Sequence, residues 1–241
     1  MIQLSGVSYS YGEGDVLSQI DIAIPRGEAV AIIGPNGCGK STMLKLLNGI
    51  VLPREGRYVF DGEEISAARL NQPLFAKRFH QRIGFLFQNS DAQLFCPVVH
   101  DEIAFGPRQM GLSEEAVDHR VEDCLQLLGI GKLRSRVPYH LSEGEKRKVA
   151  LASVLALNPE VLVLDEPMNG LDPRMKHFLR EIILSLNESG KTILCSTHDF
   201  KYIDGVFRTA LVLGEDHRVA RSGPYHEIIH DKTFLRAQNI L

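Results

Sequence analysis

The chain is 241 residues long, enough to bury a core as one large domain or two small ones, and we expect a single compact unit. Hydrophobic residues make up 44% and charged residues 24%, the composition of an ordinary globular protein, which argues against intrinsic disorder. A formal net charge of -3 provides no overall basic field, so we expect no nucleic-acid partner.

The cysteines and the apolar runs indicate the cellular compartment in which the chain acts. Its cysteines are spaced singly, so neither a disulfide framework nor a zinc site is indicated and a reducing cytosol fits: Cys38, Cys96, Cys124 and Cys195. The first residues do not resemble a secretory signal, and no apolar run approaches the ~18 residues that a spanning helix needs. If the protein serves a membrane process, we expect it to act from the cytosolic face through a partner.

Strand patterns open the chain and recur in its second half. Ile20, Ile22 and Ile24 alternate with polar or small residues, which predicts a strand, and an apolar run over 28–33 ends at a glycine. Three short apolar runs follow, and the last two are typical of buried parallel strands. After His198 we expect a strand pair with a turn at 214–216 and a final amphipathic helix from about Tyr225. The apolar runs cover 83–87, 161–164 and 192–196.

Helical patterns fill the middle of the chain. Ser113 is placed to cap a helix with one apolar face, made of Val117, Val121, Cys124, Leu125 and Leu128. A second helix is predicted from near Ser142 to before Pro159. Residues from about 88 to 159 are therefore expected to form a mainly helical insertion between two strands of the core.

A phosphate-binding loop follows the strand predicted at 28–33. Gly34, Gly39, Lys40 and Ser41 satisfy G-x-x-x-x-G-K-[ST] between an apolar strand and a helical run. The loop comprises Gly34, Pro35, Asn36, Gly37, Cys38, Gly39, Lys40, Ser41 and Thr42. Its N–H groups can converge on phosphate oxygens, while the lysine adds a cation and Ser41 offers a hydroxyl to Mg²⁺. We therefore predict that the loop binds Mg-ATP.

Cys38 within this loop has two interpretations. A thiol at a helix N-terminus can have a lowered pKa and be oxidisable. The alternative, which we favour, is a small residue tolerated among glycines.

Acidic residues follow the strand predicted at 161–164. Asp165 lies at the carboxyl end of that strand, where ligands gather in parallel sheets, and is a candidate ligand of Mg²⁺. Glu166 is a candidate general base for the attacking water. His198 follows the next apolar run at the same sheet edge, so we expect it to contact the γ-phosphate.

The segment Leu141-Ser142-Glu143-Gly144-Glu145 precedes a predicted helix, with the spacing of a capping box. With the phosphate loop upstream and Asp165-Glu166 downstream, it resembles the signature motif of ABC-type ATPases, and the resemblance covers nearly the whole chain. Other positions match the family in order: Tyr11 the aromatic residue stacked on adenine, Gln88 the glutamine that joins the core to the helical part, Gly170-Leu171-Asp172 the loop between subunits, and His198 the switch histidine.

This resemblance implies an α/β fold: a P-loop NTPase core with a mainly parallel sheet, an N-terminal antiparallel β subdomain and a helical subdomain insertion. Residues 1–87 and 160–241 would form the RecA-like core with its antiparallel part, and about 88–159 the helical subdomain. It also implies that two subunits pair head to tail, so that Ser142 and Gly144 meet a phosphate held by the partner, with Asp172 near the same site. Gln88 would lie close to Mg²⁺ and the attacking water.

Two carboxylates set this signature apart. The family most often reads Leu-Ser-Gly-Gly-Gln, whereas this chain has Glu143 and Glu145. Because carboxylates suit a helix N-terminus but repel a phosphate, we expect them to point away, toward a basic residue among Lys146, Arg147 and Lys148.

Residues 89–95 and 99–107, which follow Gln88, resemble ATPases of energy-coupling-factor importers. Together with Ser142-Glu143-Gly144-Glu145-Lys146 they are most similar to the ATPases of cobalt and nickel importers. The resemblance implies a transmembrane coupling subunit and a substrate-binding membrane component as partners. Leu94 and Phe95 are candidates for a groove that holds a coupling helix, and ordinary core packing stays open as the alternative.

A vitamin importer of the same type is the main alternative function, followed by a soluble non-transport ABC ATPase. A P-loop kinase would leave the signature helix unexplained.

Overall fold

The computed structural model describes residues 1–12 and 14–241, without the side chain of Lys201, and it contains two sheets. An antiparallel sheet has the strand order β2 (Leu17–Ile24), β1 (Ile2–Tyr9), β4 (Glu55–Phe60), β5 (Glu63–Glu64). The larger sheet has the order β10 (Val219–Pro224), β9 (Thr209–Leu213), β3 (Ala29–Ile33), β8 (Thr192–Ser196), β7 (Val161–Asp165), β6 (Ile83–Leu86). Its strands are parallel except for the β9–β10 hairpin, which confirms the predicted mainly parallel sheet.

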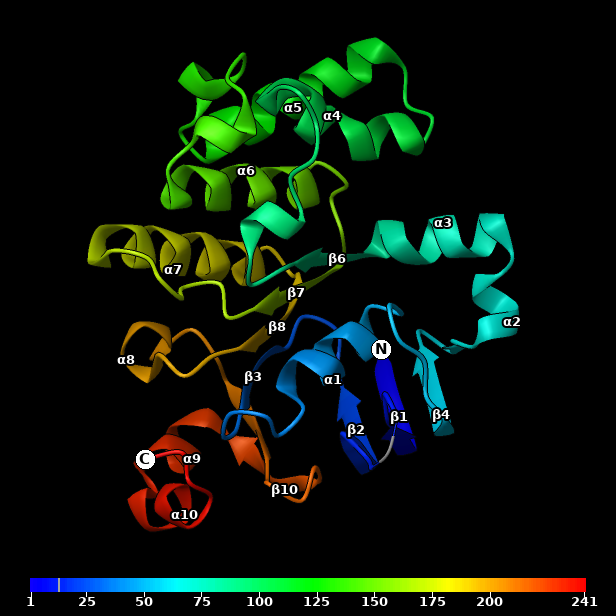
Figure 1. Cartoon of the computed structure of the whole chain (residues 1–241), viewed down its shortest axis with the longest axis vertical. Helices are drawn as coiled ribbons and strands as arrows, with labels where there is room; N and C mark the ends of the chain where they lie inside the picture. Colours follow the sequence, from blue (N-terminus) through cyan, green and yellow to red (C-terminus); the bar gives the residue numbers. More distant parts are fainter. Residues whose placement is uncertain (13) are drawn as a thin grey trace.

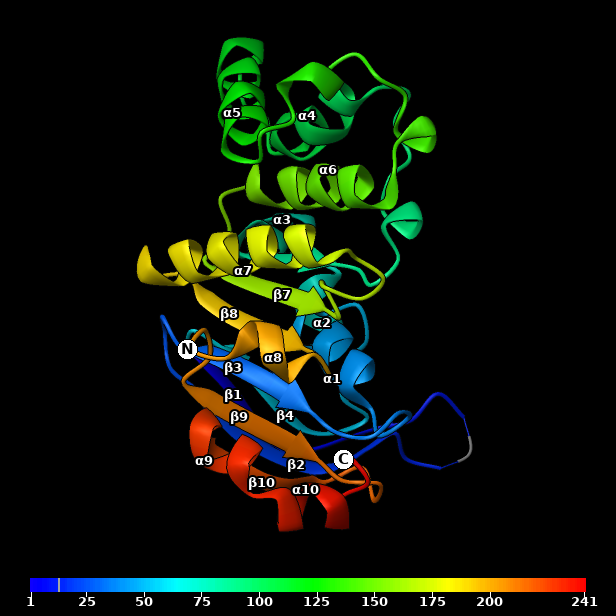
Figure 2. The same cartoon turned by 90° about the vertical axis from the view of Figure 1, so that its left-hand side faces the viewer.

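The residues of the parallel strands alternate between two cores. Val30 and Ile32 of β3 face α1 (Lys40–Leu47) and the antiparallel sheet, whereas Ala29, Ala31 and Ile33 face the helices on the other side. Because both faces are covered, all five residues of β3 are buried. This packing places the start of α1, and with it the phosphate loop, at the carboxyl ends of the parallel strands, whose arrowheads point toward α1 in Figure 2.

The chain between β6 and β7 is built of helices, which lie at the top of Figure 1 beyond α7 (Pro173–Glu188). They are η1 (Ser90–Ala92), α4 (Val99–Gln109), α5 (Glu114–Leu127), η2 (Gly131–Leu133), η3 (Pro138–His140) and α6 (Glu143–Leu155). The Ser113 hydroxyl caps α5 by accepting from the Ala116 N–H at 3.3 Å, and the predicted apolar face is buried. The predicted extents of α5 and α6 are confirmed within two or three residues.

Two segments differ from the sequence-based expectation. The helices α2 (Ala67–Leu70) and α3 (Pro73–Arg82) were not foreseen, because Phe79 is the only buried residue of α3 and no apolar periodicity marks it. The single C-terminal helix expected from about Tyr225 is instead α9 (Tyr225–His230) and α10 (Lys232–Ala237), which follow α8 (Phe200–Ile203) and the hairpin. Asp231 interrupts the run, since its carboxylate accepts from the Phe234 N–H at 3.0 Å and starts α10.

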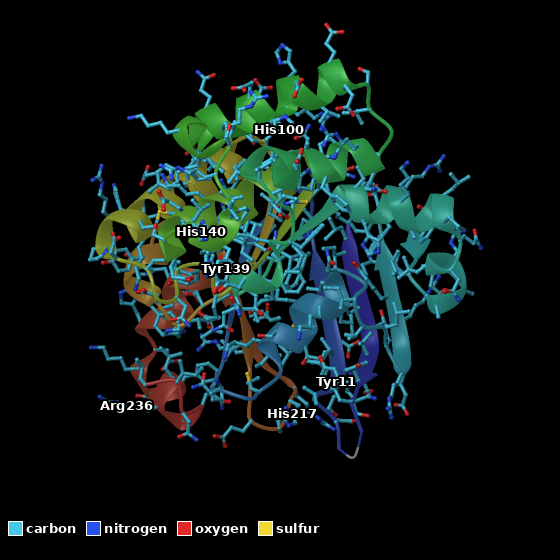
Figure 3. The ribbon with its side chains drawn as sticks, turned by 45° about the horizontal axis from the view of Figure 1, so that its top comes forward. Tyr11, His100, Tyr139, His140, His217 and Arg236 are labelled. Atoms are coloured by element: carbon cyan, nitrogen blue, oxygen red, sulfur yellow. The ribbon has the colours of Figure 1, made fainter. Side chains whose placement is uncertain are left out.

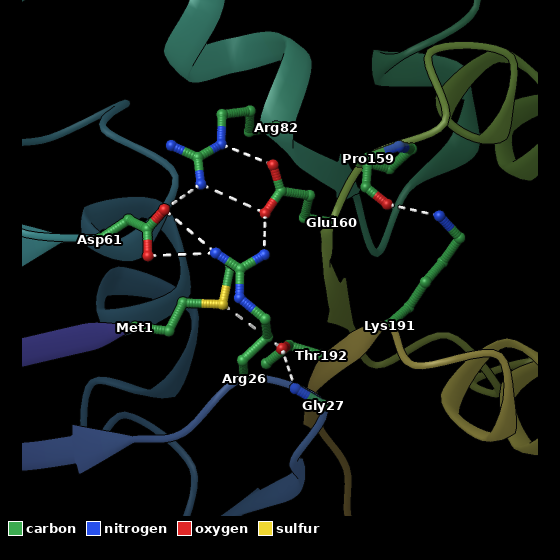
Figure 4. Close-up of polar contacts among 9 residues, drawn as sticks. All are labelled: Met1, Arg26, Gly27, Asp61, Arg82, Pro159, Glu160, Lys191 and Thr192. Atoms are coloured by element: carbon green, nitrogen blue, oxygen red, sulfur yellow. Dashed lines mark hydrogen bonds and ion pairs between the residues drawn. The ribbon is translucent and has the colours of Figure 1, made fainter.

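An ion-pair network joins the sheets at the amino ends of the parallel strands (Figure 4). Arg26, Arg82 and Glu160 lie just before β3, β6 and β7, and Asp61 is in the β4–β5 turn of the antiparallel sheet. Arg82 donates to Glu160 at 2.7 Å and to Asp61 at 2.5 Å, and Arg26 contacts both carboxylates. The network therefore pins the antiparallel sheet to the end of the parallel sheet that lies away from the phosphate loop.

Candidate functional site

Glycines of the phosphate loop let it pack closely against two other segments. A Cβ at Gly34 would lie 2.6 Å from the Leu213 carbonyl oxygen, and one at Gly39 would collide with the Val16 carbonyl oxygen. Gly39 also has a φ of 107°, a left-handed conformation that side chains disfavour. The loop is thus held against the β1–β2 connection and the end of β9 while its N–H groups lead into α1, whose first N–H groups have no partner within the helix.

The residues of the loop fit a magnesium–nucleotide complex. Lys40 Nζ donates to the carbonyl oxygens of Gly34 at 2.8 Å and Pro35 at 2.9 Å, so its ammonium group is kept beside the loop. Ser41 Oγ lies 3.0 Å from the carboxylate of Asp165, which is 5% exposed. A hydroxyl and a carboxylate oxygen are the hard ligands that Mg²⁺ takes beside phosphate.

Ser196 is a residue of this site that the sequence analysis missed. It is fully buried at the end of β8, directly opposite Asp165 in the parallel register. Its hydroxyl donates to Asp165 Oδ1 at 2.6 Å and accepts from the Glu166 N–H at 2.9 Å. One hydroxyl therefore orients both acidic residues, and the signal in the sequence was a polar residue ending the strand next to β7.

Glu166 and His198 are brought together as a carboxylate–imidazole pair. Glu166 Oε2 lies 2.9 Å from His198 Nδ1, and the carboxylate is nearly buried whereas the imidazole is mostly exposed. Glu166 has a φ of 44°, a strained conformation for a residue with a side chain, which its bonds to Ser196 hold in place. Such a carboxylate, fixed and paired with an imidazole, is suited to accept a proton from water.

The phosphate loop, Glu166 and His198 line a cavity of about 470 Å³ at the carboxyl edge of the sheet. Gln88, Glu166 and His198 come together in its lining, as predicted from the sequence, and Val16 and Asn169 were not predicted. Residues of the phosphate loop complete the wall: Asn36, Gly37, Gly39, Lys40, Ser41 and Thr42.

The backbone at Gln88 is tied to α6. Arg147, 4% exposed, donates to the carbonyl oxygens of Phe87 at 2.6 Å and Gln88 at 2.5 Å. Gln93 bridges the same segment to α6, accepting from the Phe87 N–H at 3.2 Å and donating to the Ala150 carbonyl at 3.1 Å. The wall of the cavity that carries Gln88 is thus anchored on the helix that begins at Ser142.

The start of α6 is closed by a capping box, which corrects the expected direction of Glu145. Its carboxylate turns back to accept from the Ser142 hydroxyl at 2.7 Å and the Ser142 N–H at 2.9 Å, bonds that hold the Glu145 pKa below its usual value. The prediction that it points toward a basic neighbour was wrong, because the N–H and hydroxyl of Ser142 at the helix start are donors within hydrogen-bond distance of the carboxylate. Glu143 does turn toward Lys146, at 3.7 Å.

Ser142 and Gly144 are not in the lining of the cavity, and nothing described within the chain requires a glycine at 144. A Cβ there would meet only Met175, at an ordinary 3.7 Å. Figure 3 shows Tyr139, just before the signature, well separated from Tyr11. Tyr11 is exposed, contacts the edge of Tyr9 and lies outside the cavity lining.

Asp172 and Cys38 have roles that the chain itself explains. The Asp172 carboxylate caps α7, accepting from the Met175 N–H at 2.9 Å. Burial raises the pKa of the Cys38 thiol, which argues for the small packed residue rather than the oxidisable thiol.

Residues 17–169 match the family model described as ABC transporter. A putative ABC transporter ATP-binding protein of Clostridium acetobutylicum is 58% identical over 241 residues, all of both chains. The nickel import ATP-binding protein LarO of Lactiplantibacillus plantarum is 43% identical, over 91% of each chain.

Two further relatives extend the comparison. The energy-coupling factor transporter ATP-binding protein EcfA of Methanothermobacter thermautotrophicus is 41% identical, over 100% of this chain and 76% of its own. The structure of CbiO1 from Clostridium perfringens, part of the ABC transporter complex CbiONQ, superposes with a TM-score of 0.84. It is 34% identical over 99% of this chain and 94% of its own.

Proposed function

Because the chain belongs to the ABC transporter family and is an ATPase of that family, we propose that it energises an energy-coupling-factor importer as one of two head-to-tail ATPase subunits. The observation that carries this proposal is the division of the site. The phosphate loop and Glu166 line one cavity, with Asp165 bonded to Ser41 of the loop, whereas Ser142 and Gly144 lie outside its lining at the start of α6. A composite site in a dimer uses both.

In the proposed site, the loop N–H groups and Lys40 bind the phosphates of ATP. Ser41 and Asp165 would hold Mg²⁺, and Gln88 lines the same cavity as Ser41. When bound, the ion supplies positive charge that offsets the charge developing on the transferred phosphoryl group. Ser196 keeps the Asp165 carboxylate in place for this role.

Glu166 would accept the proton of the attacking water. Its carboxylate is held by the Ser196 contacts at the backbone and by the imidazole of His198. His198 is mostly exposed, so its ring can turn from Glu166 toward a bound γ-phosphate. The pair thus couples the position of the base to the presence of the nucleotide.

Ser142 and Gly144 would face the phosphates held by the second subunit, and Tyr11 would stack on the adenine. Because Gly144 has no side chain, the nucleotide of the second subunit can approach the start of α6, where the helix dipole favours negative charge. Asp172, at the start of α7, would lie in the loop between the two subunits. Such an arrangement explains a glycine that the isolated chain does not need.

The partners in the membrane would be a transmembrane coupling subunit and a substrate-binding component. Phe95 is 67% exposed and contacts Phe105 edge to face, with 4.9 Å between the ring centroids. The two rings leave an aromatic surface on the helical part, while Leu94 packs against the core. Within residues 1–12 and 14–241, no helix is both long and apolar enough to cross a membrane. We place the chain at the cytoplasmic face of the membrane, bound through this surface.

The cargo we propose is nickel or cobalt ions, and a vitamin is the alternative. Similarity to LarO supports the metal ion. A tagged chain should co-purify with membrane proteins, and cells that express the complex should accumulate ⁶³Ni²⁺ or ⁵⁷Co²⁺ in a manner lost with Glu166→Gln. Uptake of a labelled vitamin and of neither ion would overturn the cargo, and a chain that recovers no membrane protein would overturn the importer.

A further inference from the structure

The turn between β9 and β10 contacts the back of the phosphate loop. His217 Nδ1 lies 3.3 Å from the Cys38 carbonyl oxygen, although the two residues are 179 positions apart. His217 does not line the cavity, so its contact is with the outer side of the loop. Figure 3 shows His217 at the same end of the molecule as Tyr11.

The backbone of His217 is fixed on both sides. Its N–H donates to the Gly214 carbonyl at 3.1 Å, and its own carbonyl accepts from the Ser18 N–H at 2.9 Å. Its φ of 62° is left-handed, a conformation that histidine and asparagine tolerate better than most residues. The partly buried ring is therefore presented to the loop from a rigid base that also contacts β2.

A contact at the Cys38 carbonyl acts on the next N–H group. A carbonyl has only acceptor sites, so Nδ1 must carry the proton in this bond. The peptide between Cys38 and Gly39 is planar and trans, and its C=O and N–H point in opposite directions. Holding the carbonyl from the outer side therefore directs the Gly39 N–H toward the cavity that Gly39 lines.

We propose that His217 is a positioning residue for ATP binding, which orients the Cys38–Gly39 peptide so that the Gly39 N–H meets a phosphate of the nucleotide. On the same side, close packing holds the loop, with Leu213 against Gly34 and Val16 against Gly39. His217 adds a directional bond to that packing. The inference rests on the proposed role of the loop in binding the phosphates.

Two substitutions separate the hydrogen bond from the turn. His217→Asn accepts the left-handed backbone and keeps a donor near the position of Nδ1, while His217→Gly accepts the backbone and removes the donor. We expect His217→Gly to raise the Kd and the KM for ATP about five-fold, the effect of one lost hydrogen bond, with kcat unchanged. His217→Asn should bind ATP within about twofold of the unsubstituted chain.

The test is equilibrium binding of ATP with Mg²⁺ to the full chain carrying Glu166→Gln, with steady-state kinetics in the chain that keeps Glu166. Equal affinity in the glycine and asparagine variants, or a fall in kcat with KM unchanged, would overturn the role of His217. Lys40→Ala is the reference: if it binds ATP normally, the proposed function of the loop fails. If Lys40→Ala loses binding and His217→Gly does not, only the inference about His217 fails.

Discussion

At the amino ends of the parallel strands charged side chains neutralise one another, whereas at the carboxyl ends they surround a cavity. Arg26, Arg82 and Glu160 precede three strands and pair with one another and with Asp61. Asp165 and Glu166 are held by Ser196 at the end of β7, and Glu166 lines a space of about 470 Å³. The parallel register thus assigns stability to one edge of the sheet and chemistry to the other.

The largest effect expected from this contrast is on turnover. Glu166→Gln removes the proposed general base and should lower kcat by about 10²- to 10⁴-fold while ATP binding is retained. Glu160→Gln, the same change at the opposite edge, should leave kcat within about twofold. An ATPase assay with both variants is the measurement, and normal turnover in Glu166→Gln would show that this residue is not the base.

The two ends of β8 offer a second contrast. Ser196→Ala frees the Asp165 carboxylate and removes one of the two acceptors of the Glu166 N–H, and should lower kcat roughly ten-fold, the effect of about one lost positioning bond. Thr192→Val removes an equally buried hydroxyl, which accepts from the Gly27 N–H, and should lower the Tm without lowering kcat. Equal losses of kcat in both variants would mean that Ser196 acts through stability alone.

A smaller effect is expected from the network itself. Glu160→Gln should lower the free energy of unfolding by about 1 kcal/mol and the Tm by roughly 2–4 °C. The value is modest because the carboxylates of Asp61 and Glu160 are 37% and 36% exposed, so water screens the pairs. Differential scanning calorimetry against Glu63→Gln, which breaks a separate exposed pair with Arg69, is the measurement. An unchanged Tm in Glu160→Gln would show that the network does not contribute to stability.

The smallest expected effect is in the pH dependence of stability. Donation from Arg82 and then Arg26 lowers the pKa of Asp61 and of Glu160 in the folded chain. A carboxylate with a lowered folded pKa contributes stability that is complete above its unfolded pKa, about 4, and is lost as the pH falls through the folded value. Chemical denaturation between pH 7 and pH 3 should therefore show that the double variant Asp61→Asn/Glu160→Gln loses less stability below about pH 4 than the unsubstituted chain does. An equal dependence of the unfolding free energy on pH in the double variant and the unsubstituted chain would contradict the prediction.

Local chemistry explains what the sequence predicted well. The phosphate-loop pattern, the acidic pair after β7 and the caps at Ser113 and Ser142 each depend on a few neighbouring residues. The sequence also has the spacing of a capping box at Ser142, yet the basic residues nearby suggested that the Glu145 side chain points toward them. The Ser142 N–H, which lies within hydrogen-bond distance of the carboxylate, determines the direction of that side chain.

Other features depend on packing between distant segments. Ser196 and His217 act on residues about 30 and 179 positions away, so no local pattern marks them. The ion-pair network needs the parallel register before Arg26, Arg82 and Glu160 become neighbours. Little beyond Pro73 at its first position marks α3 in the sequence, because Phe79 is the one buried residue of this helix.

If each ATP site uses two chains, two variants that are inactive alone should complement each other in a mixed dimer. Lys40→Ala damages the phosphate loop and Gly144→Asp the signature, and the described packing leaves room for a side chain at 144. Each variant alone should be nearly inactive, but a mixed dimer contains one intact composite site. An equimolar mixture should therefore regain roughly a quarter of the unsubstituted activity, since half of randomly paired dimers are mixed and one of their two sites is intact. A mixture no more active than its components would show that the site lies within a single chain.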